Sequence, residues 1–590
     1  MTIKKHIQRR QLENAPLEFV GLPSFLSRIY QARGIRSSEE LQLNLAGLLS
    51  TEKIKGIEAA VALLLGVLQE NKKVLIVGDF DCDGATSTAL AMLVFRHLNI
   101  DCQYLVPNRF EYGYGLTPEI VELAAKKSPD LIVTVDNGIS SLDGVRYAKS
   151  LGIQVLVTDH HLPGDQLPEA DAIVNPNQPG CDFLSKNAAG VGVIFYVLSA
   201  LRAKLRELDW FKHHGIAELN MASYLDLLAL GTVADLVPLD RNNRILVEQG
   251  LRRIRAGKCR YGIQALLQQA GKSYQHINAS DMGFIVGPRL NAAGRLDDMS
   301  LGIECLLTES FDEAQLLARK LDALNAERKE IEQEMKLDAE AQLSAFFENL
   351  DSSNKSNVNQ EVDAWGLCLY QAHWHQGVIG ILASRIKEKL NRPTIIFAPA
   401  SDDPNIENPV LKGSARSIPG FHMRDALDLL AKRHPELLSK FGGHAMAAGM
   451  SIEYQHFTAF SAAFDAIVKE LLTESDLQAV MMTDGELPDE EISLDNIALL
   501  ERSGPWGQTF PEPRFDGVFV VLQSRVLKEK HLKLVLSNGQ GQQLVDAIQF
   551  NSDWCKERLP AKVRIVYRPN INEFRGKKSI QFLIDYLEPA

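Results

Sequence analysis

Three short clusters of aspartate and histidine are the residues of this chain best suited to chemistry. They lie in GDFDCDG, VDNG and TDHH, and their side chains are Asp79, Asp81, Asp83, Asp136, Asp159, His160 and His161. Gathering so many carboxylates is costly unless cations cancel their charge. Oxygen ligands with a few imidazoles suit Mn²⁺ or Mg²⁺. Because the ligands outnumber those that one ion needs, we expect two divalent metal ions, an arrangement that promotes in-line attack on phosphorus.

Each cluster follows an apolar run that predicts a strand. The runs at 74–77, 102–106, 131–135 and 153–157 alternate with helical segments at 85–98, from Thr117 and from near Ser140. This alternation is typical of an α/β fold with a parallel sheet covered by helices. The carboxyl ends of parallel strands meet at one edge, so the clusters should converge there. One cluster alone would more often be a loop former, but three after strands of one sheet favour a site.

The rest of the chain predicts three further parts. Residues 311–343 hold no proline or glycine and repeat apolar residues at helical spacing. We therefore expect a long helix that bridges two globular units, with an amphipathic helix inside one larger domain as the alternative. A second α/β unit is expected from Trp365, and short apolar strands after residue 515 suggest a small barrel or sandwich. The expected divisions are 1–305, 306–350, 351–472 and 473–590.

Composition places the chain among ordinary globular proteins of several domains. Of its 590 residues, 45% are hydrophobic and 23% are charged, and no window resembles a membrane span. The seven cysteines form no CxxC pair, so we expect reduced thiols. The N-terminus lacks the apolar stretch of a secretory signal, so we expect a cytoplasmic protein with no membrane partner. The net charge of −12 does not exclude nucleic acid, because bound metal neutralises aspartates and basic residues cluster at 252–260 and 562–578. A solvated surface is the commoner interpretation of such basic clusters.

Taken together, the three acidic clusters resemble the DHH phosphoesterase superfamily, whose name matches the triplet at 159–161. In that family a fourth aspartate lies on a later strand–helix turn, and it corresponds to Asp235 in GTVADLVPL, with Asp226 as a nearby rival. The chain departs from the pyrophosphatase branch, which has a histidine at the place of Val77. Asp79 is the candidate substitute for that histidine.

Four later motifs narrow the resemblance. GPRLNAAGR, HQGVIG, GSARS and GGHAMAAG are similar to the RecJ family of single-stranded-DNA-specific exonucleases. The resemblance implies a DHH catalytic domain, a bridging helix, a DHH-associated substrate-binding domain and a C-terminal OB-type barrel that binds nucleic acid. The implied activity is removal of 5′-mononucleotides from single-stranded DNA in the 5′-to-3′ direction, with Mn²⁺ or Mg²⁺, in DNA repair and recombination.

The resemblance also assigns roles to the acidic clusters. The implied metal ligands are Asp79, Asp81, Asp83, Asp136, His160 and Asp235, with Asp136 as the bridging carboxylate. Asp79 and Asp159 are either ligands or residues that orient the ligands. His161 would hold the scissile phosphate or assist the leaving oxygen, with a structural role as the alternative. The catalytic set is thus Asp136, Asp159, His160 and His161.

Arginine suits phosphate because its planar fork is always charged and bidentate. The candidates for binding phosphate or DNA are Arg109, Arg289, Arg295, Ser414, Arg416, Ser417, Gly443 and His444. Glycine at 442 and 443 would allow close approach of a ligand, and His444 resembles a histidine that meets substrate across the cleft. We expect Arg289, Arg416 and Ser414 to grip a 5′-terminal phosphate, although ion pairs are the alternative for the arginines of GPRLNAAGR.

Several aromatic residues are candidates for stacking on bases, with a place in the protein core as the alternative. They are Tyr112, Tyr114, Phe515, Tyr567, Phe574 and Phe582. The expected partners are single-stranded DNA and, beyond it, a single-strand-binding protein and a helicase. Two other functions stay open: a DHH phosphoesterase for small oligonucleotides or cyclic dinucleotides, and an inactive nucleic-acid-binding relative. The C-terminal β unit argues against the first, and the complete acidic set argues against the second.

Overall fold

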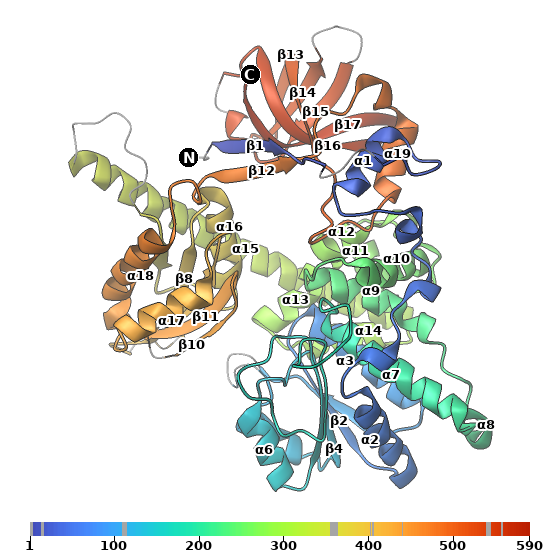
Figure 1. The fold of residues 1–590 in the computed structure, drawn as a ribbon. Helices are drawn as coiled ribbons and strands as arrows, with labels where there is room; N and C mark the ends of the chain where they lie inside the picture. The colour runs from blue at the N-terminus through green and yellow to red at the C-terminus, as the bar shows by residue number, and fades with distance from the viewer. Residues whose placement is uncertain are drawn as a thin grey trace.

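The computed structural model describes residues 4–12, 17–108, 112, 115–353, 364–401, 403, 406–438, 440–538, 544–555 and 558–590; of 345–353 and 574 it describes the backbone alone. These residues form a helix-covered parallel sheet, a second sheet joined to it by a long helix, and a closed barrel (Figure 1). The predicted α/β fold with a C-terminal β unit is confirmed.

The first sheet has the strand order β3-β2-β4-β5-β6, and all neighbouring strands are parallel. Its strands are β2 (Val74–Gly78), β3 (Cys102–Leu105), β4 (Leu131–Val135), β5 (Gln154–Thr158) and β6 (Ala172–Val174). Every residue of β2 and β4 is buried, as expected for central strands covered on both faces. Strand β3 lies on one side of β2 and β4 on the other, so the strand order switches here, and open α/β sheets bind ligands at such a point.

Helices cover this sheet and continue into a large helical layer beneath the barrel (Figure 1). They are α1 (Ser24–Gln31), α2 (Ile57–Glu70), α3 (Cys82–His97), α5 (Pro118–Ala125), α6 (Leu142–Ser150), α7 (Gly190–Glu207), α8 (Trp210–His214), α9 (Leu225–Ala234), α10 (Arg241–Arg255), α11 (Tyr261–Gln269), α12 (Ala279–Asp281), α13 (Gly287–Leu296) and α14 (Ser300–Leu307). Thr117 caps α5 with proline at the first helical position, as predicted. Helices α3, α7 and α9 pack against one another, and they hold the buried end of the candidate site.

The predicted bridging helix is present as α15 (Phe311–Ser353), which runs for 43 residues. Its first part packs against α11, α13 and α14, and a later part joins an apolar cluster of the second α/β unit. That unit has the sheet order β10-β11-β9-β8-β7, in which only β7 and β8 are parallel. Its elements are β7 (Leu367–Tyr370), α16 (Ile379–Leu390), β8 (Thr394–Pro399), β9 (Val410–Arg416), α17 (Met423–Arg433), β10 (Lys440–Gly443), β11 (Ala447–Glu453) and α18 (Phe457–Leu471).

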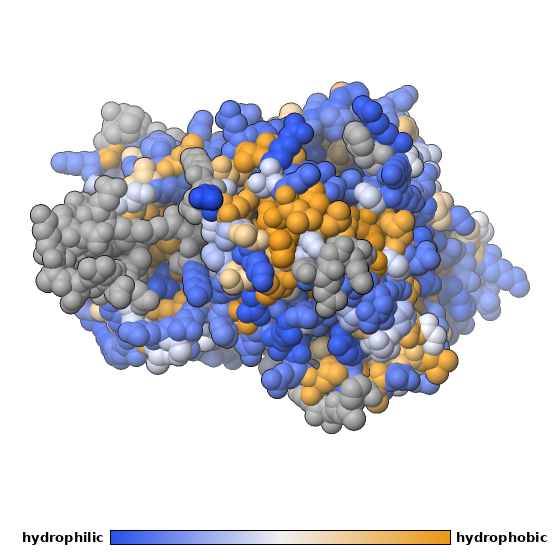
Figure 2. All heavy atoms as spheres, turned by 90° about the horizontal axis from the view of Figure 1, so that it is seen from above, coloured by the Kyte–Doolittle hydropathy of each residue, from blue (hydrophilic) through white to orange (hydrophobic). Residues whose placement is uncertain are grey.

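The C-terminal strands close into a barrel rather than a sandwich. They are β13 (Phe515–Leu527), β14 (His531–Ser537), β15 (Leu544–Gln549), β16 (Lys562–Phe574) and β17 (Lys577–Pro589). The sequence analysis missed β15, a strand of six residues that includes Asp546. Seen from above the barrel, apolar side chains gather near the middle of the face and polar side chains surround them (Figure 2).

The stacking role predicted for the barrel aromatics is wrong for the three whose side chains are described. Phe515, Tyr567 and Phe582 are almost fully buried, and the rings of Tyr567 and Phe582 stack with centroids 4.0 Å apart. They fill the barrel interior because the inward positions of a small barrel must be occupied by side chains. Tyr114 and the side chain of Phe574 lie outside the described residues.

The N-terminal segment packs at a place that no sequence pattern predicts. Strand β1 (Lys5–Arg9) pairs in parallel with β12 (Ala479–Thr483), beside α19 (Leu494–Arg502) and the barrel. The prediction grouped residues 1–305 as one unit, yet these first described residues lie with the C-terminal part (Figure 1). A five-residue strand of mixed polarity carries no signal for a partner more than 450 residues away.

Two negative expectations concern the membrane and disulfides. None of the helices in the described parts of the chain is long and apolar enough to span a bilayer. All seven cysteines are free thiols.

Candidate metal centre

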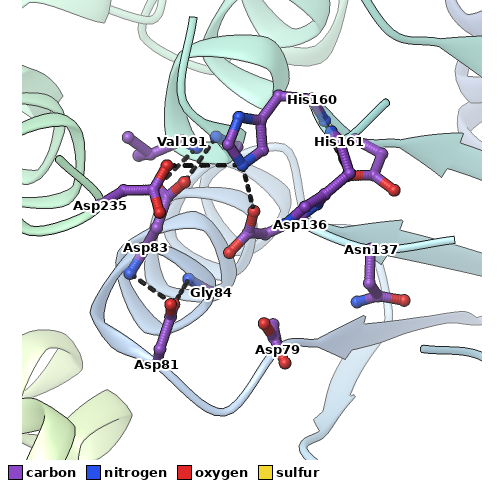
Figure 3. A network of polar contacts seen from close by, with 12 residues as sticks. Asp79, Asp81, Asp83, Gly84, Asp136, Asn137, His160, His161, Val191 and Asp235 are labelled. Carbon is purple, nitrogen blue, oxygen red and sulfur yellow. Dashed lines mark hydrogen bonds and ion pairs between the residues drawn. The ribbon is translucent and has the colours of Figure 1, made fainter. Parts of the chain in front are cut away.

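The first acidic cluster lies in the turn between β2 and α3. Asp81 caps α3: its Oδ1 accepts hydrogen bonds from the amides of Asp83 and Gly84, at 2.9 and 3.0 Å. This explains why α3 begins three residues before the predicted start. Asp79 accepts a bond from the amide of Phe80 at its Oδ1. The turn thus presents three carboxylates at the carboxyl end of β2 (Figure 3).

The innermost carboxylate, Asp83, is held by the start of a second helix. Its two oxygens accept hydrogen bonds from the amides of Gly190 and Val191, at 2.6 and 3.0 Å. Two positions near Asp83 require glycine because a side chain there would clash with the site. A Cβ on Gly190 would lie 2.6 Å from the Asp136 Cβ, and one on Gly231 would lie 2.8 Å from Asp83 Oδ1. None of these three residues was predicted from the sequence: Gly190 and Val191 lie in NAAGVGV, and Gly231 lies in GTVADLVPL.

Asp136 follows β4 and faces the same space. Its backbone has a φ of +63°, a left-handed conformation that aspartate adopts more readily than most residues. The neighbouring Asn137 donates hydrogen bonds to the carbonyl oxygens of Val77 and Val135, so it ties the loop to the ends of two strands. Asp136 is thereby fixed at the switch point, between the first cluster and the histidines (Figure 3).

The histidine pair follows β5 and is oriented by Asp159. That buried carboxylate accepts bonds from the backbone amides of His160 and His161 and contacts His161 Nδ1 at 2.7 Å. Its other oxygen accepts the Ile139 amide. Asp159 belongs to none of the candidate ligand groups among the described residues, so the structure favours orientation over direct ligation for this aspartate.

Of the two candidates for the fourth aspartate, Asp235 lies in a candidate ligand group and Asp226 does not. Asp235 ends α9, rather than lying on a strand–helix turn as the resemblance implied, and its Oδ2 lies 3.5 Å from His160 Nε2. Asp226 lies at the other end of α9, where its carboxylate accepts the Arg260 amide at 2.6 Å. A sequence pattern cannot distinguish these two, because both lie on one buried apolar helix.

Burial and the crowding of carboxylates dominate the electrostatics of the cluster. Burial, reinforced by neighbouring carboxylates, raises the pKa of Asp83 to about 7 and raises the pKa of Asp136 and Asp235 well above the ordinary aspartate range. Burial lowers the pKa of His160 to about 4, which keeps its imidazole neutral and able to act as a ligand. Burial opposes protonation of His161, but its hydrogen bond to Asp159 and the surrounding carboxylates outweigh this and raise its pKa to about 9.

These residues fit divalent cations. Three sets have potential ligand atoms within 4.8 Å of one another: Asp79, Asp81 and Asp136; Asp83, His160 and Asp235; and Asp136, His160 and His161. His160 Nε2 is buried 3.1 Å from Asp136 Oδ1, yet its geometry satisfies no hydrogen bond with any described residue. Buried carboxylates and an imidazole without a hydrogen bond form the oxygen–nitrogen donor set suited to Mn²⁺. Asp136 and His160 each belong to two of the sets, and Asp136 is the carboxylate that two sets share.

Helix α13 connects this centre to the second α/β unit. Asn291 accepts the Cys82 amide at 2.7 Å, and a Cβ on Gly294 would lie 1.9 Å from the Phe80 carbonyl oxygen. At the end of the same helix, Arg295 donates to the carbonyl oxygen of Gly377 at 3.0 Å. The GPRLNAAGR motif therefore packs between the first acidic cluster and the HQGVIG motif.

The predicted phosphate-binding residues fall into two groups. Arg416 and Ser414 lie together, with Arg416 Nη1 3.1 Å from Ser414 Oγ, and both adjoin Gly380 near the start of α16. Arg289 instead binds Asp322 of α15 through Nε and Nη2, both at 2.8 Å from one carboxylate oxygen. Arg289 thus forms an ion pair, which was the expected alternative to phosphate binding. Arg109 lies outside the described residues.

Two other residues predicted to bind phosphate or DNA, Ser417 and Gly443, have structural roles. Ser417 is buried and donates its hydroxyl to the Phe421 carbonyl oxygen at 2.7 Å, so it stabilises its own loop rather than contacting phosphate. Gly443 has a φ of +144°, and a Cβ there would lie 2.5 Å from the Ala447 carbonyl oxygen. The β10–β11 hairpin therefore requires glycine at this position without any ligand.

His444 lies within electrostatic reach of the histidine pair. Its pKa is lowered by desolvation and then by the charge of His161, and the charge of His444 contributes in turn to the lowered pKa of His160. His444, at the tip of the β10–β11 hairpin of the second α/β unit, therefore lies within electrostatic range of the metal-ligand cluster.

The fold and this site define a metal-dependent phosphoesterase with its ligands at the switch point of a parallel sheet. Comparison with protein families agrees: the DHH family N-terminal domain matches residues 73–232, the DHHA1 domain matches 363–470, and the RecJ OB domain matches 483–586.

Individual relatives extend the match to the whole chain. The single-stranded-DNA-specific exonucleases RecJ of Escherichia coli and Haemophilus influenzae are 51% and 49% identical to it, with 100% of each chain covered. The crystal structure of Thermus thermophilus RecJ in complex with Mn²⁺ superposes with a TM-score of 0.77 at 28% identity, covering 96% of this chain and 76% of that one. The chain belongs to the RecJ family of the DHH phosphoesterases.

Proposed function

We propose that the protein is a single-stranded-DNA-specific exonuclease that releases 5′-mononucleotides in the 5′-to-3′ direction and acts in DNA repair and recombination. The observation that carries this proposal is the convergence of Asp79, Asp81, Asp83, Asp136, His160 and Asp235 at the carboxyl ends of β2, β4 and β5 and the end of α9. Relatives at about half identity over their full length are named single-stranded-DNA-specific exonucleases.

The six clustered residues would hold two divalent ions, Mn²⁺ or Mg²⁺, which supply an activated water and neutralise charge on the scissile phosphate. Two backbone amides hold both oxygens of Asp83 in place. Asp159 fixes the imidazole of His161 through its Nδ1. His161 would then hold the scissile phosphate or protonate the leaving oxygen.

The 5′ end of the strand would be held by the second α/β unit. Arg416 and Ser414 offer a guanidinium and a hydroxyl near the start of α16, where helix amides also favour an anion. With Arg289 engaged by Asp322, we restrict the expected 5′-phosphate pocket to Arg416 and Ser414. A fixed spacing between this pocket and the ions would limit each cut to one nucleotide.

The finer parts of the proposal rest on the sequence and the resemblance. The division at 305, 350 and 472 is kept, with strand β1 reassigned to the barrel side. We place the protein in the cytoplasm, with single-stranded DNA as substrate and a single-strand-binding protein and a helicase as candidate partners.

The test is hydrolysis of a 5′-labelled single strand, the same sequence as a blunt duplex, and a dinucleotide, each with Mn²⁺, Mg²⁺ or a chelator. We expect mononucleotides from the single strand, little product from the duplex, and none with chelator. Faster turnover of the dinucleotide than of the strand would instead support a small-substrate phosphoesterase.

A further inference from the structure

Four exposed apolar side chains lie on segments that border the polar metal-ligand cluster. Leu162 directly follows His161, and Leu236 directly follows Asp235. Leu184 and Phe284 come from two neighbouring segments. Their exposed fractions are 58% for Leu162, 80% for Leu184, 66% for Leu236 and 78% for Phe284. Exposed apolar residues are ordinary when they are scattered singly, but several gathered at one site indicate a binding surface.

Hydrogen bonds join the three leucine-bearing loops to one another. Asn177 donates to the carbonyl oxygens of His160 and Lys186, at 2.6 and 3.2 Å, which joins the loop of Leu162 to that of Leu184. Ser185 donates to Asp240 at 2.7 Å, which joins the loop of Leu184 to the segment after Asp235. The three leucines therefore occupy neighbouring loops at the edge of the site.

Phe284 belongs to a π-helical turn, Met282–Val286, that packs on the end of α9 that precedes Asp235. A Cβ on Gly283 would lie 3.2 Å from the Val233 side chain, and one on Gly287 would lie 3.2 Å from the Ala234 Cβ. Val233 and Ala234 immediately precede Asp235. Isolated π-helical turns are frequent at functional sites.

Leu236 is the most informative of the four because its backbone is also unfavourable. Its φ is +60°, in the left-handed region that glycine and asparagine adopt at lower cost than leucine. With its side chain mostly exposed, leucine gains little packing in return. The fold therefore gives no reason for leucine here, and a strained residue beside a site points to a role in function.

We propose that Leu236, together with Leu184 and Phe284, forms an apolar platform for a nucleobase of the strand whose phosphodiester lies at the metal centre. This inference rests on the proposed function, since it needs a nucleic-acid strand at the site. A platform without polar groups recognises the face that all bases share, so it is tolerant of sequence. Bases stacked in a duplex are not free to lie on it, so it also contributes to the preference for single strands.

The experiment measures single-turnover release of the first nucleotide by the full chain. The substrates are an intact strand and strands with one abasic nucleotide at the first, second, third or fourth position. Leu236→Gly should release the nucleotide roughly five- to tenfold more slowly from the intact strand, the scale of losing one base contact. An abasic nucleotide at the contacted position should slow the wild type to the variant's rate and leave the variant unchanged.

Stability separates this role from a structural one. Leu236→Gly and Leu236→Asn relieve the backbone conformation, so both should unfold at the same temperature as the wild type or higher. Phe284→Ala should show the same dependence on the abasic position as Leu236→Gly. Leu208→Ala is the matched control, because this exposed leucine follows the far end of α7, about 27 Å along the helix from Gly190.

Two results would overturn the inference. One is a Leu236→Gly variant that matches the wild type on the intact strand. The other is a variant whose defect is the same at every abasic position, or follows a lower unfolding temperature in both Leu236 variants. Failure of the wild type to degrade the intact strand would instead refute the proposed function, and the inference with it.

Discussion

Two buried aspartate sites in this molecule are built from similar carboxylates but have opposite electrostatics. In the barrel, the fully buried side chain of Asp516 accepts hydrogen bonds from Arg9, Arg564 and Thr483. At the sheet edge, Asp83, Asp136 and Asp235 lie among one another and two histidines. The first site pairs its carboxylate with two arginines, whereas the second gathers carboxylates and imidazoles, the donor set of divalent cations.

The pKa directions express the same difference. Burial alone would raise the pKa of Asp516, but its hydrogen bonds to Arg9, Thr483 and Arg564 outweigh burial and lower it. For Asp136 and Asp235, burial and the other carboxylates act together and raise the pKa. A buried carboxylate paired with guanidinium groups is structural, whereas a crowded one without them indicates a metal site.

Asp136→Ala should lose more hydrolytic activity than any other variant considered below. Removing the carboxylate shared by two ligand sets should lower the rate of strand hydrolysis by about 10³-fold or more. The metal-free variant should be at least as stable as the metal-free wild type, because one of several repelling charges is gone. Steady-state hydrolysis and thermal unfolding in chelator check this. Retained activity would show that hydrolysis does not depend on the carboxylates at the sheet edge.

Asp516→Ala should show the reverse pattern. Leaving Arg9 and Arg564 without their buried partner should reduce the free energy of unfolding by about 2–4 kcal/mol, discounted because both arginines are partly exposed. Metal affinity should be unchanged. Denaturant unfolding and Mn²⁺ titration test the two parts, and weakened Mn²⁺ binding in this variant would contradict the account.

The two sites should also give opposite pH dependence. In metal-free protein the folded state retains protons on Asp83, whose pKa rises from 3.8 to about 7, so stability should fall as pH rises through that range. Asp516 has a lowered folded-state pKa, so its contribution is present above pH 3.8 and is lost as the pH falls through the folded-state value. Unfolding midpoints in chelator should decline with rising pH, less steeply in Asp136→Asn. A decline of equal slope in that variant would argue against the carboxylate cluster as its cause.

The smallest expected change in rate distinguishes two arginines, Arg416 and Arg289. Arg416→Ala should slow hydrolysis of 5′-phosphorylated strands about tenfold and leave 5′-hydroxyl strands nearly unchanged. Arg289→Ala is the matched control, because its guanidinium binds Asp322 and its loss should affect both ends equally. Equal losses on both substrates in Arg416→Ala would remove it from the 5′-phosphate pocket.

The first sheet and its ligands were predictable because their signal is local. Apolar runs ending in GDFDCDG, VDNG and TDHH define strands and place carboxylates at their ends, and sheet topology brings them together. The residues that hold Asp83 in place were not predictable. Gly190 and Val191 bind it through their backbone amides, which any residue type other than proline provides. The same limit explains Ser417, whose burial was not visible in GSARS, and β1, whose partner lies near the other end of the chain.

The two-ion site at the sheet edge can be measured by calorimetric titration of the metal-free protein with Mn²⁺. We expect saturation at two ions per chain in the wild type and in Asp516→Ala, and loss of at least one ion in Asp136→Ala. Binding that does not saturate, or a stoichiometry that Asp136→Ala leaves unchanged, would rule out this metal centre.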